Sequence, residues 1–277
     1  MAFSAGSSGR EPGGQQVDFG FKQVPRDEKA TLVGQVFSSV APSYDVMNDL
    51  MSGGLHRLWK DRLVEKLRPF PGMQHLDVAG GTGDVAFRVL EAMRRAEFQQ
   101  QPAAAAERPA QQGVVTVFDI NPSMLQEGQK RAAAQGLDQR SLRWVEGNAE
   151  QLPFEDNSFD SYTVAFGIRN VTDRDAALRE AHRVLRKGGR FLCLEFSKLA
   201  VPGLQQLYDL YSFNVIPQIG RVVANDAESY QYLVESIRMF PDQESWARQI
   251  EEAGFRGVEF ENQTLGVVAI HSGFKLD

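Results

Sequence analysis

Apolar positions along the chain follow two spacings that alternate with each other. Short, nearly continuous apolar runs predict β-strands, and segments with apolar residues at every third or fourth position predict amphipathic helices. The predicted strands span residues 73–78, 114–120, 142–148, 159–168 and 190–197. The fourth run is apolar almost throughout, which is typical of a strand buried on both faces of a parallel sheet. Residues 173–189 predict one of these helices, which ends at the two glycines at 188 and 189. The alternation of strands with helices predicts a doubly wound α/β fold.

The segments on either side of this alternating region predict further elements. Residues 29–70 have helical spacing interrupted at Pro42 and at a Ser-Gly-Gly sequence, which predicts two or three helices that cover the sheet. Residues 242–254 predict a helix. Residues 257–263 and 266–276 predict two strands that finish the sheet as a hairpin at its edge.

Three segments have compositions that differ from the rest. Residues 1–18 are rich in glycine and serine and predict a disordered leader, and residues 97–113 are of low complexity and predict a surface insertion. Residues 199–225 are rich in aromatic residues and longer than a crossover requires, which predicts an inserted cap. We therefore expect a helical cover over residues 19–70 and the main domain over residues 71–277.

The composition narrows the classes of partner. Hydrophobic residues make up 42% of the 277 residues, and no apolar window approaches the roughly 20 residues of a membrane-spanning helix. The net charge of -6 comes from mixed signs, so we expect no nucleic-acid partner. The single cysteine, Cys193, excludes an intramolecular disulfide. The four histidines show no zinc-binding spacing, so we expect no metal ion.

A glycine turn follows the first strand of the alternating region. Gly81, Thr82 and Gly83 allow a tight passage from strand to helix, where a ligand can approach bare backbone. Residues 81–86 fit the G-x-G-x-x-A pattern of dinucleotide sites, and Asp119 ends the second strand, where an acid meets ribose hydroxyls. Both a nicotinamide cofactor and S-adenosylmethionine (SAM) would use these residues.

Residues before and after the turn favour SAM. Asp77 precedes the turn, and its carboxylate can meet the cationic methionine end of SAM, whereas it would repel a pyrophosphate. Asn148 and Ala149 follow the third strand and can present side-chain and backbone groups to an adenine edge. An equally good interpretation is that Asn148 merely forms a turn.

Three longer segments carry a family resemblance. They are YDVMNDLMSGGLHRLW at 44–59, AFGIRNVTD at 165–173 and HRVLRKGGRFLCLEFS at 182–197. Together with the order of the motifs, they resemble class I SAM-dependent methyltransferases, and within these the ubiquinone/menaquinone biosynthesis C-methyltransferase family. The resemblance extends from about residue 19 to residue 276 and is strongest to the mitochondrial branch of the family.

The resemblance implies a Rossmann-like, mostly parallel sheet of seven strands with a helical N-terminal cover and an inserted substrate cap. It implies SAM as the cofactor and a polyprenyl benzoquinol, methylated on a ring carbon, as the substrate in ubiquinone biosynthesis. It also implies a mitochondrial protein that contacts the matrix face of the inner membrane peripherally. A homodimer and other quinone-biosynthesis proteins are the expected protein partners.

The resemblance also assigns roles at the acceptor end of the site. Arg169 would stabilise a developing phenolate or orient a water that takes the proton. Asn170 would hold the second ring oxygen. Tyr44 would contact the quinol or SAM, and His56 has the side chain whose ordinary pKa best suits proton transfer near neutral pH.

These assignments have structural alternatives. Arg169 could pair with Asp173 or Asp175 at a helix start. His56 could simply pack its helix against the sheet. The apolar residues of 199–225 could form core, or they could shield a polyprenyl tail, of which each buried CH₂ contributes about 0.8 kcal/mol.

Two other functions use some of the same features. An NAD(P)-dependent oxidoreductase would share the glycine turn, and a non-catalytic lipid-binding or scaffold subunit could keep the methyltransferase fold. The scaffold alternative predicts that Asp119→Ala and Arg169→Ala leave cellular function intact. The intact glycine turn and these two residues argue against it.

Overall fold

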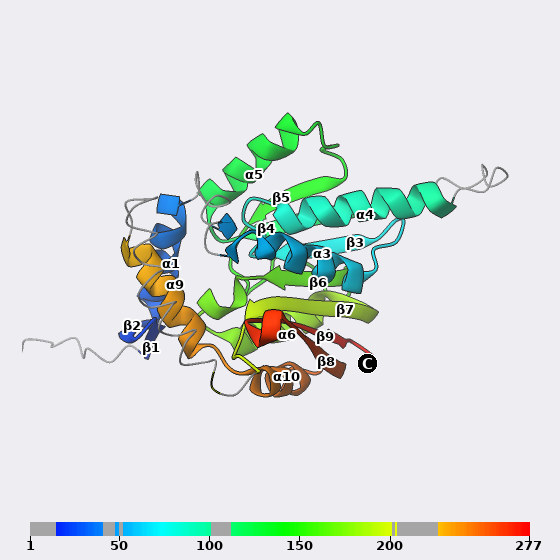
Figure 1. Cartoon of the computed structure of the whole chain (residues 1–277). Helices are drawn as coiled ribbons and strands as arrows, with labels where there is room; N and C mark the ends of the chain where they lie inside the picture. The colour runs from blue at the N-terminus through cyan, green and yellow to red at the C-terminus, as the bar shows by residue number, and fades with distance from the viewer. Residues whose placement is uncertain (1–14, 41–47, 50–51, 101–111, 201–202, 204–226) are drawn as a thin grey trace, which may run out of the picture.

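A computed structural model describes residues 15–40, 48–49, 52–100, 112–200, 203 and 227–277. Within them, seven strands form one sheet in the order β5-β4-β3-β6-β7-β9-β8, and two more form a hairpin (Figure 1). The strands of the large sheet are β3 (Gln74–Val78), β4 (Val114–Asp119), β5 (Leu142–Glu146), β6 (Phe159–Ala165), β7 (Leu185–Phe196), β8 (Arg256–Gln263) and β9 (Val268–Phe274).

The pairing of the strands confirms the predicted α/β sheet. β3, β4, β5, β6 and β7 pair in parallel, whereas β9 runs antiparallel to both β7 and β8. The last two strands form the predicted hairpin, with β8 at the edge. All six residues of β4 are buried, as its apolar sequence requires of a strand covered on both faces.

Helices cover both faces of this sheet. One apolar cluster joins the strands to α3 (Leu55–Leu67), α4 (Asp84–Gln100) and α5 (Pro122–Ala134). A second cluster joins the opposite face to α6 (Arg174–Val184) and α10 (Gln243–Glu252). In Figure 1, α4 lies above the strands and α10 below them.

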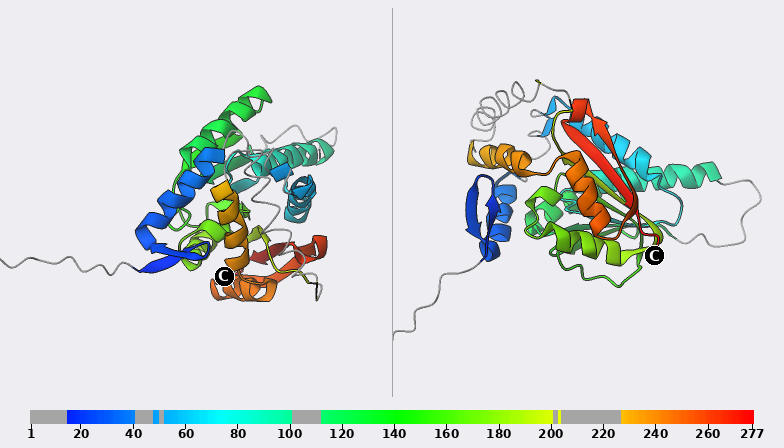
Figure 2. Two further views of the ribbon diagram at one scale, coloured as in Figure 1. Left: turned by 60° about the vertical axis from the view of Figure 1, so that its left-hand side comes forward. Right: turned by 90° about the horizontal axis from the view of Figure 1, so that it is seen from below.

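A separate group of elements lies together at one end of the sheet (Figure 2). It comprises β1 (Gln16–Phe19), β2 (Lys22–Pro25), α1 (Arg26–Val40) and α9 (Ala227–Met239). The rings of Phe19 and Tyr232 stack with centroids 4.2 Å apart, which joins the hairpin to α9. Lys29 Nζ donates to the backbone oxygen of Val171 at 3.3 Å, which joins α1 to the segment after β6. We name these four elements the cover; they overlap only in part with residues 19–70, for which the sequence predicted a helical cover.

Several elements differ from the expected boundaries. Residues 16–18, expected in the leader, belong to β1. Neither the hairpin of β1 and β2 nor α9 was predicted. α6 ends at Val184, although the sequence favoured a helix up to the two glycines at 188 and 189. Leu185 is fully buried and extended, and it already pairs with β6, so the strand begins there.

The two predicted insertions are only partly visible. α4 continues to Gln100, inside the segment 97–113, because glutamate and glutamine are good helix formers. Residues 101–111 and nearly all of the expected cap, 201–202 and 204–226, lie outside the described residues.

Two features are absent from the part of the chain that the structure describes. None of its helices is long and apolar enough to cross a membrane. None of its His, Cys, Asp and Glu side chains form a group of three or more that could hold a metal ion.

Candidate active site

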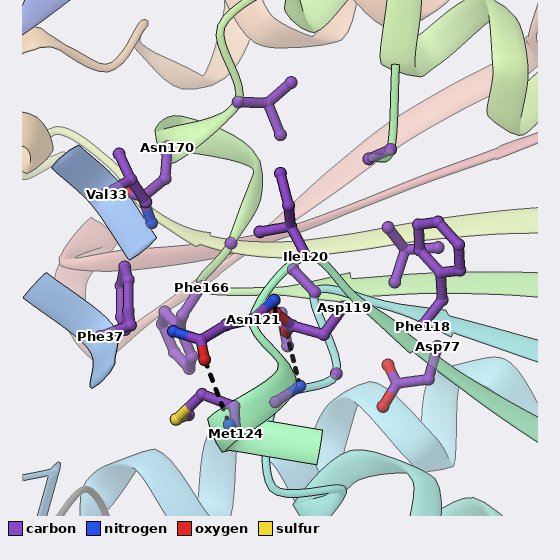
Figure 3. A pocket seen from close by; sticks show the side chains of 18 of the residues that line it. Val33, Phe37, Asp77, Phe118, Asp119, Ile120, Asn121, Met124, Phe166 and Asn170 are labelled. Carbon is purple, nitrogen blue, oxygen red and sulfur yellow. Dashed lines mark hydrogen bonds between the residues drawn. The ribbon is translucent and has the colours of Figure 1, made fainter. Parts of the chain in front are cut away.

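A cleft opens at the carboxyl ends of β3, β4, β5 and β6, the place where sheets of this kind bind ligands. Its empty volume, which includes space open to solvent, is about 1090 Å³. The segments that follow the four strands line it, and Val33 and Phe37 of α1 close one side (Figure 3). The cover and the sheet therefore bound the cleft together.

The glycine turn between β3 and α4 brings bare backbone into the cleft. Gly81 has a φ of 53°, a left-handed conformation that favours glycine, and its amide donates to Asp119 Oδ2 at 2.9 Å. A Cβ on Gly80 would lie 2.7 Å from Val117 Cγ1, so no side chain fits there. A ligand in the cleft consequently meets backbone at this turn.

Thr82 and Gly83 have more structural parts in the same turn. Thr82 lines the cleft, while its Oγ1 accepts a hydrogen bond from Arg131 at 2.8 Å. Gly83 has a φ of 83°, and a Cβ there would lie 2.8 Å from the ring of Trp144. Of these two expected cofactor contacts, the structure brings Thr82 to the cleft and places Gly83 against Trp144.

Asp119 lies at the end of β4, as expected from the sequence. Its two carboxylate oxygens accept from the backbone amides of Gly81 at 2.9 Å and Asn121 at 2.8 Å. Burial raises the pKa of Asp119 to about 6, and these backbone hydrogen bonds oppose the rise. Each oxygen keeps a further lone pair that a ribose hydroxyl can use.

Asp77 lies on the cleft side of β3 with one oxygen unused. Its Oδ1 accepts from Thr163 Oγ1 at 2.7 Å, whereas the buried Oδ2 has no hydrogen-bond partner among the described residues. Burial raises the pKa of Asp77 to about 7, and the hydrogen bond from Thr163 opposes this. An unpartnered buried carboxylate oxygen at a cleft is a ready acceptor for a cationic ligand.

Asn148 and Ala149 also line the cleft. Asn148 is exposed, and its Oδ1 accepts from the backbone amide of Glu150 at 3.0 Å. The turn-forming interpretation of Asn148 is therefore correct, and it leaves the side-chain nitrogen at the cleft. Both roles considered for this residue are compatible.

Asn170 and Arg169 share the short helix η2 (Ile168–Asn170) after β6 but have different surroundings. Asn170 lines the cleft (Figure 3), and its Oδ1 accepts from the hydroxyl of Tyr232 at 3.0 Å. The side chain of Arg169 is only 4% exposed and lies behind the cleft wall, beside α9. The structure therefore brings Asn170, but not the guanidinium, to the cleft lining.

The partner of Arg169 is Glu195 at the end of β7, with Nη1 and Oε1 2.9 Å apart. The same nitrogen donates to the backbone oxygen of Phe166 at 2.6 Å. The expected alternative, a pair with Asp173 or Asp175, is wrong, because the guanidinium pairs with Glu195 instead, and Asp173 pairs with Arg26 of the cover at 2.8 Å. Burial raises the pKa of Glu195, and the charge of Arg169 opposes that rise.

His56 lies in α3 beside the cleft, is 5% exposed, and is not among the described residues that line it. Its Nε2 is 2.7 Å from Asp49 Oδ1, and its buried Nδ1 has no hydrogen-bond partner in the described part of the chain. Burial lowers the pKa of His56, and the hydrogen bond with Asp49 opposes this. This geometry fits the packing alternative; Tyr44 lies outside the described residues.

Comparison with known proteins identifies the family. The model of the ubiE/COQ5 methyltransferase family matches residues 22–275. The chain belongs to the ubiE/COQ5 methyltransferase family. It is therefore a SAM-dependent methyltransferase, and the nicotinamide alternative is set aside.

Individual relatives of this ubiE/COQ5 methyltransferase match along nearly the whole chain. A protein of Arabidopsis thaliana is 60% identical over 264 residues, which are 94% of this chain and 90% of that protein. A protein of Bos taurus is 55% identical over 281 residues, with 94% and 84% coverage. Both are named "2-methoxy-6-polyprenyl-1,4-benzoquinol methylase, mitochondrial".

Solved structures resemble the methyltransferase in fold. The [4+2]-cyclase SpnF superimposes with a TM-score of 0.62 at 17% identity, covering 89% of this chain and 96% of that chain. A SAM-dependent methyltransferase of Thermotoga maritima, described as a possible histamine N-methyltransferase, gives a TM-score of 0.58 at 18% identity, with 87% and 98% coverage. These likenesses support the fold alone.

The residues of the cleft fit the cofactor of the ubiE/COQ5 family. The unpartnered Oδ2 of Asp77 suits a cationic amino group, and the bare backbone at Gly81 leaves room for a ligand. Asp119 offers acceptors to ribose hydroxyls, and Asn148 a donor to adenine. These residues would hold SAM.

Sequence reasoning missed several cleft residues, among them Val33, Phe37, Ile120 and Asn121. Ile120 is 42% exposed in the cleft, although it is a large apolar side chain, and it suits the flat face of an adenine ring. Asn121 caps α5 and ties it to α1. The signal for Ile120 was its position directly after the strand-ending Asp119, but the alternating pattern assigned it to the strand.

Proposed function

We propose that this chain transfers a methyl group from SAM to a ring carbon of 2-methoxy-6-polyprenyl-1,4-benzoquinol in ubiquinone biosynthesis. The observation that carries the proposal is the identity of 52–60% to proteins of that name along 94% or more of this chain. Four of the relatives' organisms are a plant, two mammals and an amoeba, so the name is shared by distant lineages.

The cleft supplies a binding surface for each end of such a reaction. SAM supplies a methyl group on a positively charged sulfur, and its transfer leaves S-adenosylhomocysteine. Asp77, Asp119 and Asn148 hold the amino group, the ribose and the adenine of the cofactor in this proposal. Fixing two reactants in line can lower a barrier by roughly 7–11 kcal/mol at the upper range, so positioning is the main contribution of the chain.

Asn170 is the proposed contact for a ring oxygen of the quinol. Its Oδ1 is held by Tyr232, so the side-chain nitrogen is oriented with its hydrogens available as donors. A donor there stabilises negative charge that develops on the ring oxygen as the neighbouring carbon attacks. Free phenols titrate near pH 10, which makes this stabilisation necessary near neutral pH.

Arg169 supports the same segment in the proposal. Its guanidinium holds the backbone oxygen of Phe166, and Phe166 and Asn170 both line the cleft. Glu195 balances the charge of Arg169, so the proposed contribution of Arg169 is to hold this backbone in place. Tyr44 is proposed as a further ring contact, and His56 as a residue that orders the start of α3.

The names of the relatives support a mitochondrial location. We place the chain at the matrix face of the inner membrane, in peripheral contact with it, because a polyprenyl tail partitions into lipid. A homodimer and association with other quinone-biosynthesis proteins complete the proposal. Flotation of the purified protein with quinone-loaded liposomes tests the membrane contact, and failure to float contradicts it.

Product analysis tests the reaction. The chain is incubated with methyl-labelled SAM and with demethylated benzoquinol and naphthoquinol acceptors in separate reactions. We expect label on a ring carbon of the benzoquinol. Label on oxygen, or transfer to the naphthoquinol alone, would overturn the proposal.

A matched pair of variants tests the role of Asn170. Asn170→Asp keeps the size and removes the donor, so we expect kcat to fall about 100-fold or more, the loss typical of one oxyanion donor. Asn170→Gln keeps the donor on a longer arm and serves as the control. Equal activity of Asn170→Asp and the unchanged protein would contradict the assignment.

A further inference from the structure

Four polar side chains lie side by side in a mostly apolar layer, on the face of the sheet that α3 and α4 cover. His75 and Asp77 come from β3, and Ser161 and Thr163 come from the neighbouring β6. All four are 2% exposed or less. Because strand residues two apart share a face, the register pairs His75 with Ser161 and Asp77 with Thr163. Burial of so many polar groups costs free energy unless they bond to one another.

The four side chains form a continuous hydrogen-bonded chain. His75 Nδ1 is 2.8 Å from Ser161 Oγ, and His75 Nε2 is 3.0 Å from Thr163 Oγ1. Thr163 Oγ1 in turn donates to Asp77 Oδ1 at 2.7 Å. These hydrogen bonds therefore connect side chains deep in the core with the carboxylate at the cleft.

The proton count fixes the direction of this chain when Asp77 is ionised. A carboxylate only accepts, so the single hydroxyl proton of Thr163 goes to Asp77. Thr163 must then accept from His75, which puts the imidazole proton on Nε2. Burial lowers the pKa of His75 to about 3, so the ring is neutral and its Nδ1 accepts from Ser161. Every donor points toward Asp77.

If the hydrogen bonds ran in the opposite direction, the last acceptor would be a weaker one. If Asp77 were protonated, it could donate to Thr163, and the chain would reverse through His75 to Ser161. The hydroxyl of Ser161 would then donate to Met73 Sδ, which lies 3.3 Å away. A thioether is a weak acceptor, so the arrangement that ends on ionised Asp77 is the stronger one.

We propose that His75 and Thr163 are positioning residues whose one-way hydrogen bonds keep Asp77 ionised, so that its free Oδ2 can receive the cationic amino group of SAM. This inference rests on the proposed binding of SAM in the cleft. It adds two residues that touch no ligand and act only through Asp77.

The groups that act on the charge of Asp77 come from four elements, β6, α3, α4 and β4. Burial raises its pKa to about 7 and the hydrogen bond of Thr163 opposes the rise most strongly, followed by Lys60 of α3 and the amide of Ala86 in α4. Asp119 of β4 raises the pKa further. Lys60 is itself paired with Asp84 at 2.7 Å. Thr163 is thus the strongest single group that favours the charge.

Calorimetry with S-adenosylhomocysteine, which carries the same amino group as SAM, tests the proposal across a pH series from about 5 to 9. For the unchanged protein we expect the affinity to fall as the pH drops through about 7, because Asp77 takes up a proton. Thr163→Val keeps the shape of the side chain but removes the hydrogen-bond donor, so this midpoint should rise by about one pH unit. At pH values below the midpoint the variant should bind about tenfold more weakly than the unchanged protein. Thr163→Ser keeps the donor and should restore the midpoint.

The controls separate a positioning role from a structural one. 5′-Methylthioadenosine lacks the amino group, so its affinity should show no such midpoint in any variant. His75→Phe should move the midpoint in the same direction as Thr163→Val but less, because it acts one bond further away. If Thr163→Val still binds S-adenosylhomocysteine and its midpoint has not moved, the positioning role of His75 and Thr163 is refuted and the proposed function is not. Absence of S-adenosylhomocysteine binding by the unchanged protein overturns the proposed function instead.

A second measurement needs no variant that might fail to fold. Nitrogen NMR of histidine-labelled protein reports which ring nitrogen of each of the four histidines carries the proton. We expect His75 to be protonated on Nε2 at pH 8. Protonation on Nδ1 would mean that the hydrogen bonds are donated away from Asp77, and it would refute the proposal.

Discussion

At Asp77, folding and cofactor binding make opposite demands. Burial raises the folded-state pKa to about 7, above the ordinary value of 3.8, so the folded protein binds a proton that the unfolded chain has already lost. This carboxyl therefore contributes most stability below about pH 4, and the contribution is lost as the pH rises to about 7. The free carboxylate that suits a cation weakens the unliganded fold.

Asp77→Asn tests this conflict. The amide oxygen can still accept from Thr163, and the charge is gone, so we expect the free energy of unfolding at pH 8 to rise by up to about 3–4 kcal/mol. The difference from the unchanged protein should vanish near pH 4. Urea unfolding at both pH values measures it, and calorimetry should show lost affinity for S-adenosylhomocysteine. A variant less stable at pH 8 contradicts the argument.

The buried pair of Arg169 and Glu195 should obey a different rule. Glu195→Gln leaves the guanidinium buried without a counter-charge, and we expect a loss of about 3–5 kcal/mol in unfolding free energy. The double variant Arg169→Met, Glu195→Leu removes both charges and should recover most of that loss. Urea unfolding of the two variants measures these losses. An equal loss of unfolding free energy in the single and the double variant would show that the two charges do not depend on each other.

The sequence predicted some of these residues and not others for a physical reason. Asp77 lies near the end of β3, just before the glycine turn, and Asp119 ends β4, so both could be recognised from local sequence patterns. The partner of Arg169 depends on β7 lying beside β6, a neighbour relation that no local pattern contains. The four-residue polar chain likewise requires the register of two strands far apart in sequence.

Among the elements, α1 is tied to α5 by the side chain of Asn121, in addition to the contacts that Arg26 and Lys29 make with the segment after β6. Asn121 Oδ1 accepts from the amides of Ser123 and Met124 as the N-cap of α5. Its Nδ2 donates to the backbone oxygen of Gly34 at 3.1 Å and to Ser38 Oγ at 3.0 Å, both on α1. One residue thus caps one helix and holds another.

Asn121→Asp separates the two tasks. Aspartate caps a helix as well as asparagine but cannot donate, so α5 should keep its stability while α1 opens more often. Hydrogen exchange should become severalfold faster in α1 and stay unchanged in α5. Asn121→Ala removes both tasks and costs α5 about 1 kcal/mol as well. Unchanged exchange in α1 for both variants would show that the tether does not hold it.

Elements with strong apolar patterns were predicted, and the cover was predicted only in part. β1 and β2 have four residues each, none of them fully buried, so they carry little pattern. Their order comes from tertiary contacts such as the stacking of Phe19 on Tyr232, more than 200 residues away in sequence. The end of α6 was misjudged because Leu185 continues the apolar spacing of the helix although it begins the strand.

At the scale of the whole molecule, a bound cofactor should stabilise cover and sheet together, since both line the cleft. S-adenosylhomocysteine at 100 times its Kd should add about 2.7 kcal/mol to the unfolding free energy. Thermal unfolding should show one transition that moves upward, with no movement on addition of NADH. A shift with NADH of the same size would contradict the assignment of the cleft.

The position of β9 has a consequence for how the sheet is completed. β9 is synthesised after β8, yet it lies between β8 and β7 and bonds to both. Until Val268–Phe274 has left the ribosome, β7 keeps an open row of backbone donors and acceptors, and β8 has no strand to join. The parallel half of the sheet can form early in translation, but closure waits for the last strand. A nascent chain of this architecture thus stays vulnerable to pairing with other chains until β9 has been synthesised.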